Sequence, residues 1–145
     1  MTTIEPPEGA ADRFAPPVSP AAEPFWAATR ECQLVLQWCT SCEVPIHFPR
    51  EVCPTCLGDD LEFRAASGRG TVHAVSVMPK AANPTMGGRG PYAVALVDLR
   101  EGPRMFTNVI TGDPDKVVVG QPVVVAWEPL ADGRHLPVFV PDSNA

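Results

Sequence analysis

Residues 39–56 read CTSCEVPIHFPREVCPTC, and this stretch decides the fold of the first half of the chain. Two Cys-x-x-Cys pairs are separated by ten residues, which is enough chain to cross over and bring the second pair beside the first. Four thiolates held in this way form the tetrahedral ligand set that structural zinc ions favour. The sequence therefore predicts a rubredoxin-like zinc ribbon with one zinc ion bound by Cys39, Cys42, Cys53 and Cys56.

Four cysteine ligands leave no coordination position for water or substrate, so we expect a structural metal and not a hydrolytic one. The same ligand set also holds iron in electron-transfer sites, which is the alternative to zinc. His47 lies between the two pairs as a competing ligand, but four well-spaced cysteines leave it no vacancy. We expect Gly58 to supply the positive φ of a tight turn after the second pair. The fifth cysteine, Cys32, has no base near it in sequence and is expected to be a small buried side chain.

The composition of the chain limits its function. With 18 prolines in 145 residues there is little room for long helices. A net charge of −6 argues against nucleic-acid binding, which depends on basic surfaces that contact phosphates. No apolar stretch approaches the roughly 20 residues that cross a bilayer, and the acidic, proline-containing start does not resemble a secretory signal. We therefore expect a cytoplasmic protein, in which reduced cysteines bind metal and do not form disulfides.

Short apolar runs rich in β-branched residues follow the ribbon and have the length of strands. Glycine and proline turn signals separate them, for example Gly68-Arg69-Gly70 and Glu101-Gly102-Pro103. The runs are LEFRAA, TVHAVSVM, YAVALVDL, RMFTNVI, PVVVAWEPL and HLPVFV. So many short strands in one small module predict a mainly β protein that ends in a five-stranded OB-fold barrel, with an SH3-like barrel as the alternative.

The chain divides into three predicted parts: a flexible, proline-rich arm over residues 1–22, a short helix plus the zinc ribbon over 23–62, and the barrel over 63–142. An alternative for the arm is a strap that docks on a partner through Phe14. Phe25 and Trp26 are adjacent in the short helix, so their side chains point about 100° apart. We expect one of them to pack on the core and the other to be available to a second protein; packing of both on the core is the alternative.

The barrel sequence contains no recognisable catalytic arrangement. Asp98 and Glu128 end two strands without a pairing pattern, and the sequence has no Walker or Rossmann phosphate loop. The longest loop, KAANPTMGGRGP over residues 80–91, is the exception, because it carries Lys80 and Arg89. It is either a plain hairpin connection or a mobile flap that contacts an anionic ligand or a partner, with Arg69 adding a third charge.

Several segments, taken in order, resemble a known family. They are FWAATRE, QLVLQWCTSC, FPREVCPTCLGDDLEF, SGRGTVHAVSV, PYAVALVDLREGPRMFTNV and LPVF. From about Glu23 to Val140 the layout resembles the zinc-ribbon/OB-fold proteins catalogued as a domain of unknown function, which accompany thiolase-superfamily enzymes. The resemblance implies a non-catalytic accessory subunit that docks on a thiolase-like catalytic subunit and helps it handle acyl-CoA substrates.

Members of this family accompany acetyl-CoA acyltransferases, hydroxymethylglutaryl-CoA synthases, and lipid-transfer-protein-like aldolases that cleave steroid side-chain CoA thioesters. We expect the last kind of partner; the alternatives are a free-standing acyl-CoA binding module, or a partner of an acetyl-CoA acyltransferase or a hydroxymethylglutaryl-CoA synthase. This role implies Phe25 and Trp26 as partner contacts. It also makes Arg69, Lys80 and Arg89, together with Arg50, candidates to contact CoA phosphates by their charge alone. Cys32 departs from the glycine or other small residue that the family is expected to carry there.

Overall fold

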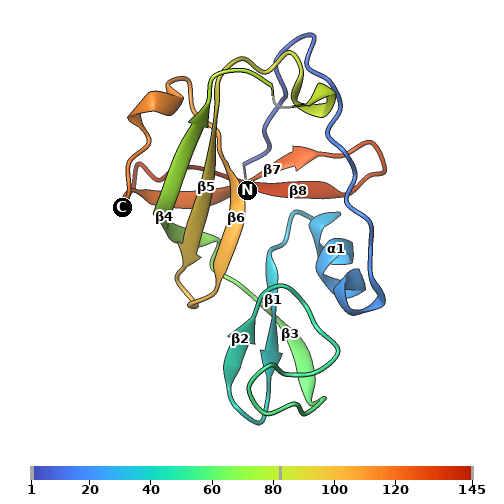
Figure 1. Ribbon diagram of the computed structural model, residues 1–145. Coiled ribbons are helices and arrows are strands. Elements are labelled where there is room, and N and C mark those ends of the chain that lie inside the picture. The colour runs from blue at the N-terminus through green and yellow to red at the C-terminus, as the bar shows by residue number, and fades with distance from the viewer. Residues whose placement is uncertain (1, 82, 145) are drawn as a thin grey trace.

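The structure is a computed structural model that describes residues 2–81 and 83–144 (Figure 1). A 3-10 turn, η1 (Pro20–Ala22), leads into the only α-helix among these residues, α1 (Glu23–Thr29). A small sheet follows with the strand order β2-β1-β3, made of β1 (Val35–Cys39), β2 (Val44–Ile46) and β3 (Leu61–Ala65). In Figure 1 this sheet lies below the barrel, with α1 beside both. No helix among the described residues is both long and apolar enough to cross a membrane.

Five further strands close into a barrel with the order β4-β5-β6-β8-β7. They are β4 (Arg69–Met78), β5 (Tyr92–Leu99), β6 (Arg104–Val109), β7 (Pro122–Pro129) and β8 (His135–Pro141), and the loops carry the 3-10 turns η2 (Pro84–Met86) and η3 (Pro114–Lys116). Every second residue of β5, from Ala93 to Leu99, is buried, which is the period of a strand with one face on a core. The predicted mainly β fold, with a short N-terminal helix, a zinc ribbon and a five-stranded OB-fold barrel, is confirmed.

The strand β3 belongs to the ribbon and not to the barrel. It pairs with β1 along its whole length, from Val35–Ala65 to Cys39–Leu61. We expected the barrel to begin at residue 63; in the structure the first barrel strand is β4. The turn between β3 and β4 needs Gly68, which has φ of +76° and on which a Cβ would lie 2.5 Å from Val125 Cγ1.

The barrel is joined between β6 and β8 by a narrow parallel contact, whereas all its other neighbouring strands are antiparallel. The one registered pair is Val109–Phe139, next to which the Ile110 amide donates to the Phe139 carbonyl oxygen at 2.7 Å. The Thr107 hydroxyl also reaches the Pro137 carbonyl oxygen at 3.3 Å. Among the described residues, the stretch of β6 before this contact pairs with β5 alone. We call the gap between this stretch of β6 and the facing strand β8, at Phe106 and Pro137, the seam.

Residues 2–22 form an extended segment, here called the strap, that runs over the end of the barrel and down to α1 (Figure 1). Thr3 makes a parallel bridge with Trp127 of β7, and the Ile4 amide donates to the Trp127 carbonyl oxygen at 2.7 Å. Further along, a Cβ on Gly88 would lie 2.5 Å from the Gly9 carbonyl oxygen, so the strap lies directly on the loop over 80–91. Where we expected a flexible arm over residues 1–22, the structure has a segment in contact with the barrel; Met1 lies outside the described residues.

Candidate functional site

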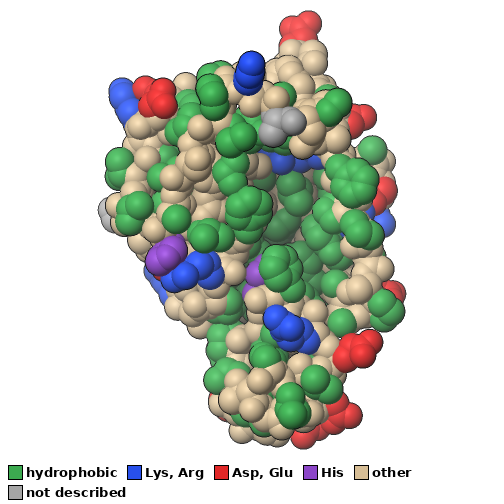
Figure 2. Space-filling model, in the orientation of Figure 1, with side chains coloured by type: hydrophobic (Ala, Val, Ile, Leu, Met, Phe, Trp, Pro, Cys, Tyr) green, Lys and Arg blue, Asp and Glu red, His purple; other side chains and the backbone are tan. Residues whose placement is uncertain are grey.

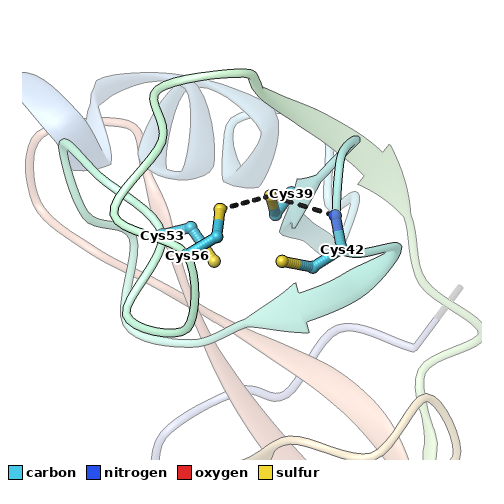
Figure 3. A group of neighbouring side chains, drawn as sticks. All are labelled: Cys39, Cys42, Cys53 and Cys56. Carbon is cyan, nitrogen blue, oxygen red and sulfur yellow. Dashed lines mark hydrogen bonds between the residues drawn. The ribbon is translucent and has the colours of Figure 1, made fainter.

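The four ribbon cysteines converge on one point (Figure 3). Their sulfur atoms all lie within 4.8 Å of one another, and the Sγ atoms of Cys39 and Cys56 are 3.7 Å apart. A tetrahedral zinc ion with Zn–S bonds of about 2.3 Å requires sulfur atoms about 3.8 Å apart, so the arrangement fits this ion. Cys39 and Cys53 are fully buried beside Ile46, whereas Cys56 reaches the surface. The predicted zinc ribbon, with four cysteines placed to bind one metal ion, is confirmed.

The two cysteine pairs repeat one backbone turn. The Glu43 amide donates to the Cys39 carbonyl oxygen, and the Leu57 amide donates to the Cys53 carbonyl oxygen, both at 2.8 Å. Glu43 and Leu57 have φ values of 54° and 61°, so the left-handed position is the residue directly after each pair. The prediction that Gly58 fills this position is wrong. Its amide instead donates to Cys56 Sγ at 3.4 Å, and donors of this kind stabilise a thiolate.

His47 lies outside the metal cluster. Its ring packs against Phe25 with the centroids 5.8 Å apart, and Nδ1 is buried with no hydrogen-bond partner among residues 2–81 and 83–144. Burial lowers the pKa of His47 from 6.5 to about 4, because the charged form loses water that nothing replaces. The imidazole is therefore part of the packing between the ribbon and α1, in agreement with a metal shell that four cysteines complete.

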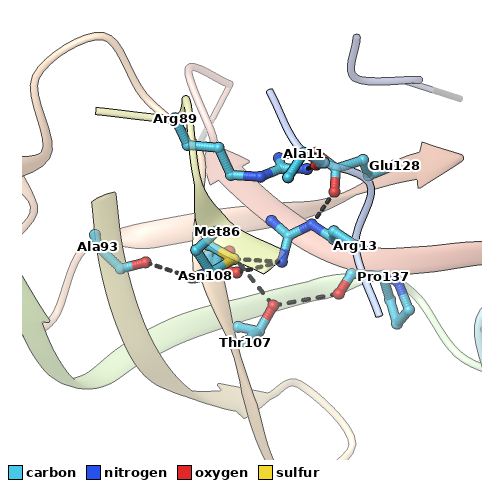
Figure 4. A network of polar contacts seen from close by, with 9 residues as sticks. All are labelled: Ala11, Arg13, Met86, Arg89, Ala93, Thr107, Asn108, Glu128 and Pro137. Atoms are coloured by element: carbon cyan, nitrogen blue, oxygen red, sulfur yellow. Dashed lines mark hydrogen bonds and ion pairs between the residues drawn. The ribbon is translucent and has the colours of Figure 1, made fainter. Parts of the chain in front are cut away.

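A buried charge cluster joins the strap, the loop over 80–91 and β7 (Figure 4). Glu128 accepts hydrogen bonds from Arg13 Nε and, at 2.7 Å, from Arg89 Nη1. The side chain of Glu128 is 2% exposed, and those of Arg13 and Arg89 are 9% and 7% exposed. Burial and the neighbouring Arg89 lower the pKa of Arg13 to about 10. This cluster was not predicted, because no pattern in the sequence signals a pairing between residues 13 and 128.

The structure does not bring the three predicted CoA-contacting cations together. Arg69 begins β4 and pairs with Asp142 at 2.5 Å, whereas Lys80 is exposed just beyond the other end of the same strand. The ten residues of β4 put these two side chains about 30 Å apart. Arg89 is held inside the charge cluster, where its Nη2 also donates to the Ala11 carbonyl oxygen at 2.9 Å.

Phe25 and Trp26 have different environments. Phe25 is 5% exposed in the main core, and Trp26 is half-buried with its ring 5.1 Å from Phe25 in an edge-to-face arrangement. The Arg134 guanidinium lies 4.9 Å from the centre of the Trp26 ring, which is the geometry of a cation–π contact. Trp26 therefore presents more surface to a partner than Phe25 does, and a partner contact at either residue stays a prediction.

An apolar cleft opens over the seam, between the barrel, the strap and the ribbon (Figure 2). Its lower part, of about 590 Å³, lies between α1, Phe48 of the ribbon and the strap, and its upper part, of about 520 Å³, extends to η2 and Arg13. The two parts share Phe106, Leu136 and Pro137, which makes them one continuous feature. Phe48 and Phe106 are 65% and 67% exposed on its walls. We call this feature the seam cleft.

Comparison with known proteins defines the class. Residues 26–62 match the family model of the ChsH2 rubredoxin-like zinc ribbon domain, and residues 63–128 match that of the ChsH2 C-terminal OB-fold domain. These two matches are contiguous, as the ribbon and the barrel are in the structure. The chain belongs to the DUF35 family of zinc-ribbon/OB-fold proteins.

Individual relatives carry several names. A "Probable enoyl-CoA hydratase alpha subunit" of Thermomonospora curvata is 38% identical over 118 residues, which are 81% of this chain and 36% of the relative. A "DUF35 domain-containing scaffold protein" of Methanocaldococcus jannaschii is 32% identical over 65% of this chain and 67% of its own length. A "3-oxo-4,17-pregnadiene-20-carboxyl-CoA hydratase alpha subunit" of Mycobacterium tuberculosis is 35% identical over 48% of this chain and 25% of the relative. The chain thus spans about a third of the Thermomonospora protein and a quarter of the Mycobacterium protein.

Among solved structures, a chain of the "Ltp2-ChsH2(DUF35) aldolase" superposes with a TM-score of 0.79 at 35% sequence identity. The match covers 88% of this chain and 98% of that chain. The resemblance therefore extends over the ribbon and the barrel together, in one arrangement.

Proposed function

We propose that this protein is a non-catalytic accessory subunit that docks on a thiolase-superfamily catalytic subunit, namely an Ltp2-like aldolase that acts on a steroid side-chain CoA thioester. The observation that carries the proposal is the similarity to a chain of the "Ltp2-ChsH2(DUF35) aldolase", which is matched over 98% of that chain's length. The name of this aldolase joins two components, Ltp2 and ChsH2. The scaffold and hydratase-subunit names of other relatives support a role within an assembly. The steroid substrate is supported by the name of the Mycobacterium relative.

The polar residues of the chain support a non-catalytic role. The nearest approach to an acid–base pair is His73 with Asp98, at 3.4 Å from Nδ1 to Oδ2. Asp98 also accepts from Arg104 Nε at 2.6 Å, and this contact lowers the pKa of the Asp98 carboxyl. In the described part of the chain no nucleophilic side chain is hydrogen-bonded to His73, so the pair lacks the third group that covalent catalysis requires. The four cysteines fill the coordination shell of a zinc ion, which leaves no position for a substrate or a reacting water.

Handling of acyl-CoA is the finer part of the proposal. Lys80 is exposed, and Arg69 is half-exposed although it pairs with Asp142, so either side chain is accessible to the CoA phosphates where the partner docks. Arg89 is committed to Glu128 and serves the fold of the barrel end. The alternative of a free-standing acyl-CoA module would require one basic surface for the nucleotide, and the separation of Arg69 and Lys80 along β4 counts against it.

Co-expression with an Ltp2-like protein of the thiolase superfamily tests the proposal. We expect the two proteins to elute as one complex, and carbon–carbon cleavage of a steroid side-chain CoA thioester to require both. Separate elution together with unchanged activity of the catalytic protein alone would refute the accessory role. Calorimetry of the isolated chain with acyl-CoA separates the alternative, because micromolar binding without a partner supports the free-standing module.

A further inference from the structure

The backbone of β6 has one edge that faces the seam. The Leu99 amide donates to the Pro103 carbonyl oxygen, which makes residues 99 and 103 a hydrogen-bonded pair of the β5–β6 ladder. Hydrogen-bonded and non-hydrogen-bonded pairs alternate in an antiparallel ladder, so Met105 and Thr107 direct their amides toward β5. Phe106 lies between them and directs its N–H and C=O toward the seam. The Ile110 amide, in the same phase as Phe106, does bond across to β8.

The facing edge of β8 does not supply a partner for Phe106. The Leu130 amide donates to the Arg134 carbonyl oxygen, which by the same alternation directs His135 and Pro137 toward the seam. The His135 amide is turned to the Thr29 hydroxyl of α1 at 3.4 Å. Pro137 has no N–H at all. Strand β8 is thus held by α1 and lacks a donor at the position where the ladder would continue.

The seam cleft is therefore an apolar trough along which the backbone N–H and C=O of Phe106 are exposed. Its walls carry the exposed rings of Phe48 and Phe106, and its upper end reaches Arg13. The charge cluster holds two guanidinium groups against the carboxylate of Glu128, and one of the two, that of Arg13, lines the upper end of the cleft. In Figure 2 the hollow has hydrophobic side chains on its sides and Lys or Arg side chains at its upper end.

We propose that an extended segment of the catalytic partner enters the seam cleft and adds to β6 as a further strand, with apolar side chains between Phe48 and Phe106 and an acidic side chain toward Arg13. The inference rests on the proposed function and identifies the docking surface. A free strand edge binds peptide backbone, because only a second backbone matches its alternating donors and acceptors. A lipid or steroid in the same trough would leave those groups of Phe106 unpaired.

Two substitutions at one residue separate side chain from backbone. Phe106→Ala removes the ring and keeps the amide; Phe106→Pro removes both, and it leaves the β5–β6 ladder intact because this N–H faces the cleft. The control is Val119→Ala, at a residue that is 66% exposed and does not line the cleft. We expect the partner to bind Phe106→Ala about 10-fold more weakly than wild type, and Phe106→Pro about 5-fold more weakly again. Val119→Ala should stay within about twofold of wild type, outside the hot spot.

The binding assay uses the full chain and the co-expressed catalytic protein described above. Hydrogen exchange of the wild-type complex is a second readout that does not depend on the folding of any variant. Formation of the complex should slow the exchange of the Phe106 amide but not that of the Val119 amide. If the complex forms, the Phe106 variants bind as wild type does and the Phe106 amide exchanges unchanged, this inference is overturned and the accessory role stands. If the wild-type chain forms no complex, both are overturned.

Discussion

The buried charge cluster leads to a quantitative prediction for Glu128→Gln. Glutamine keeps the size of the side chain, but it is neutral and must turn an NH2 group toward one of the two guanidinium groups. Arg13 and Arg89 are each more than nine-tenths buried, so neither cation regains water when the carboxylate is lost. Removing one partner of a buried ion pair typically costs about 3–5 kcal/mol. A domain has only about 5–15 kcal/mol of stability, so this is a large fraction of the total.

Urea unfolding followed by circular dichroism measures the loss. With a slope of about 2 kcal/mol per molar urea, a loss of about 3 kcal/mol lowers the midpoint by about 1.5 M. Trypsin provides a local readout, because the bond after Arg13 should become accessible once the strap detaches. The matched control is Glu62→Gln, which removes an ion pair to Arg64 whose two side chains are 47% and 36% exposed. If Glu128→Gln unfolds at the same urea concentration as this control, the cluster does not hold the strap and the reasoning fails.

Three further predictions address other parts of the chain. Cys39→Ser should reduce bound zinc from one ion per chain to almost none and remove hydrogen-exchange protection from the ribbon, since zinc-binding energy is folding energy there; metal analysis that still finds a full equivalent would contradict the closed ligand set. Cys32→Gly should stabilise the protein by about 1 kcal/mol, because Cys32 has φ of 53° at the end of α1, and a lower melting temperature would be the opposite result. The folded-state pKa of His47, about 4, lies below its ordinary value of 6.5, so protonation favours the unfolded chain; stability present above pH 6.5 is lost as the pH falls toward 4, by about 2 kcal/mol at pH 5. His47→Phe should remove this part of the difference in urea midpoint between pH 7 and pH 5, and an unchanged difference would show that His47 is not its source.

Local patterns were enough to predict most of the strands. The alternation in residues 92–99 and the cysteine spacing over 39–56 each lie within one short segment, so that segment alone was enough to predict its structure. The run that begins at Leu61 was also a strand, but no local pattern tells which sheet a strand joins. Pairing with β1 decides that, and it depends on how the two cysteine pairs fold over each other.

The charge cluster and the strap were beyond prediction for a related reason. Arg13 lies in a proline-rich stretch whose composition is typical of a disordered arm, and its partner Glu128 is 115 residues away. The positive φ at Leu57 rather than Gly58 has a different cause, because the geometry of the metal ligands sets the backbone there and overrides local preference. Sequence reasoning was therefore reliable where neighbours in the chain determine the structure, and it failed where distant segments do.

The distances between partners along the chain also set an order of events during synthesis. All four zinc ligands lie between residues 39 and 56, so the ribbon can close around its metal while the barrel is still being made. The strap emerges before the ribbon, yet its contacts with Trp127, Glu128 and Arg134 need residues that are made much later; Arg13, for example, precedes Glu128 by 115 residues. The contacts of the strap with β7 must therefore wait until the ribbon and the first three barrel strands are made, and a nascent chain stalled before β7 would carry a zinc-loaded ribbon and an open barrel with the strap only partly anchored, on the loop over 80–91.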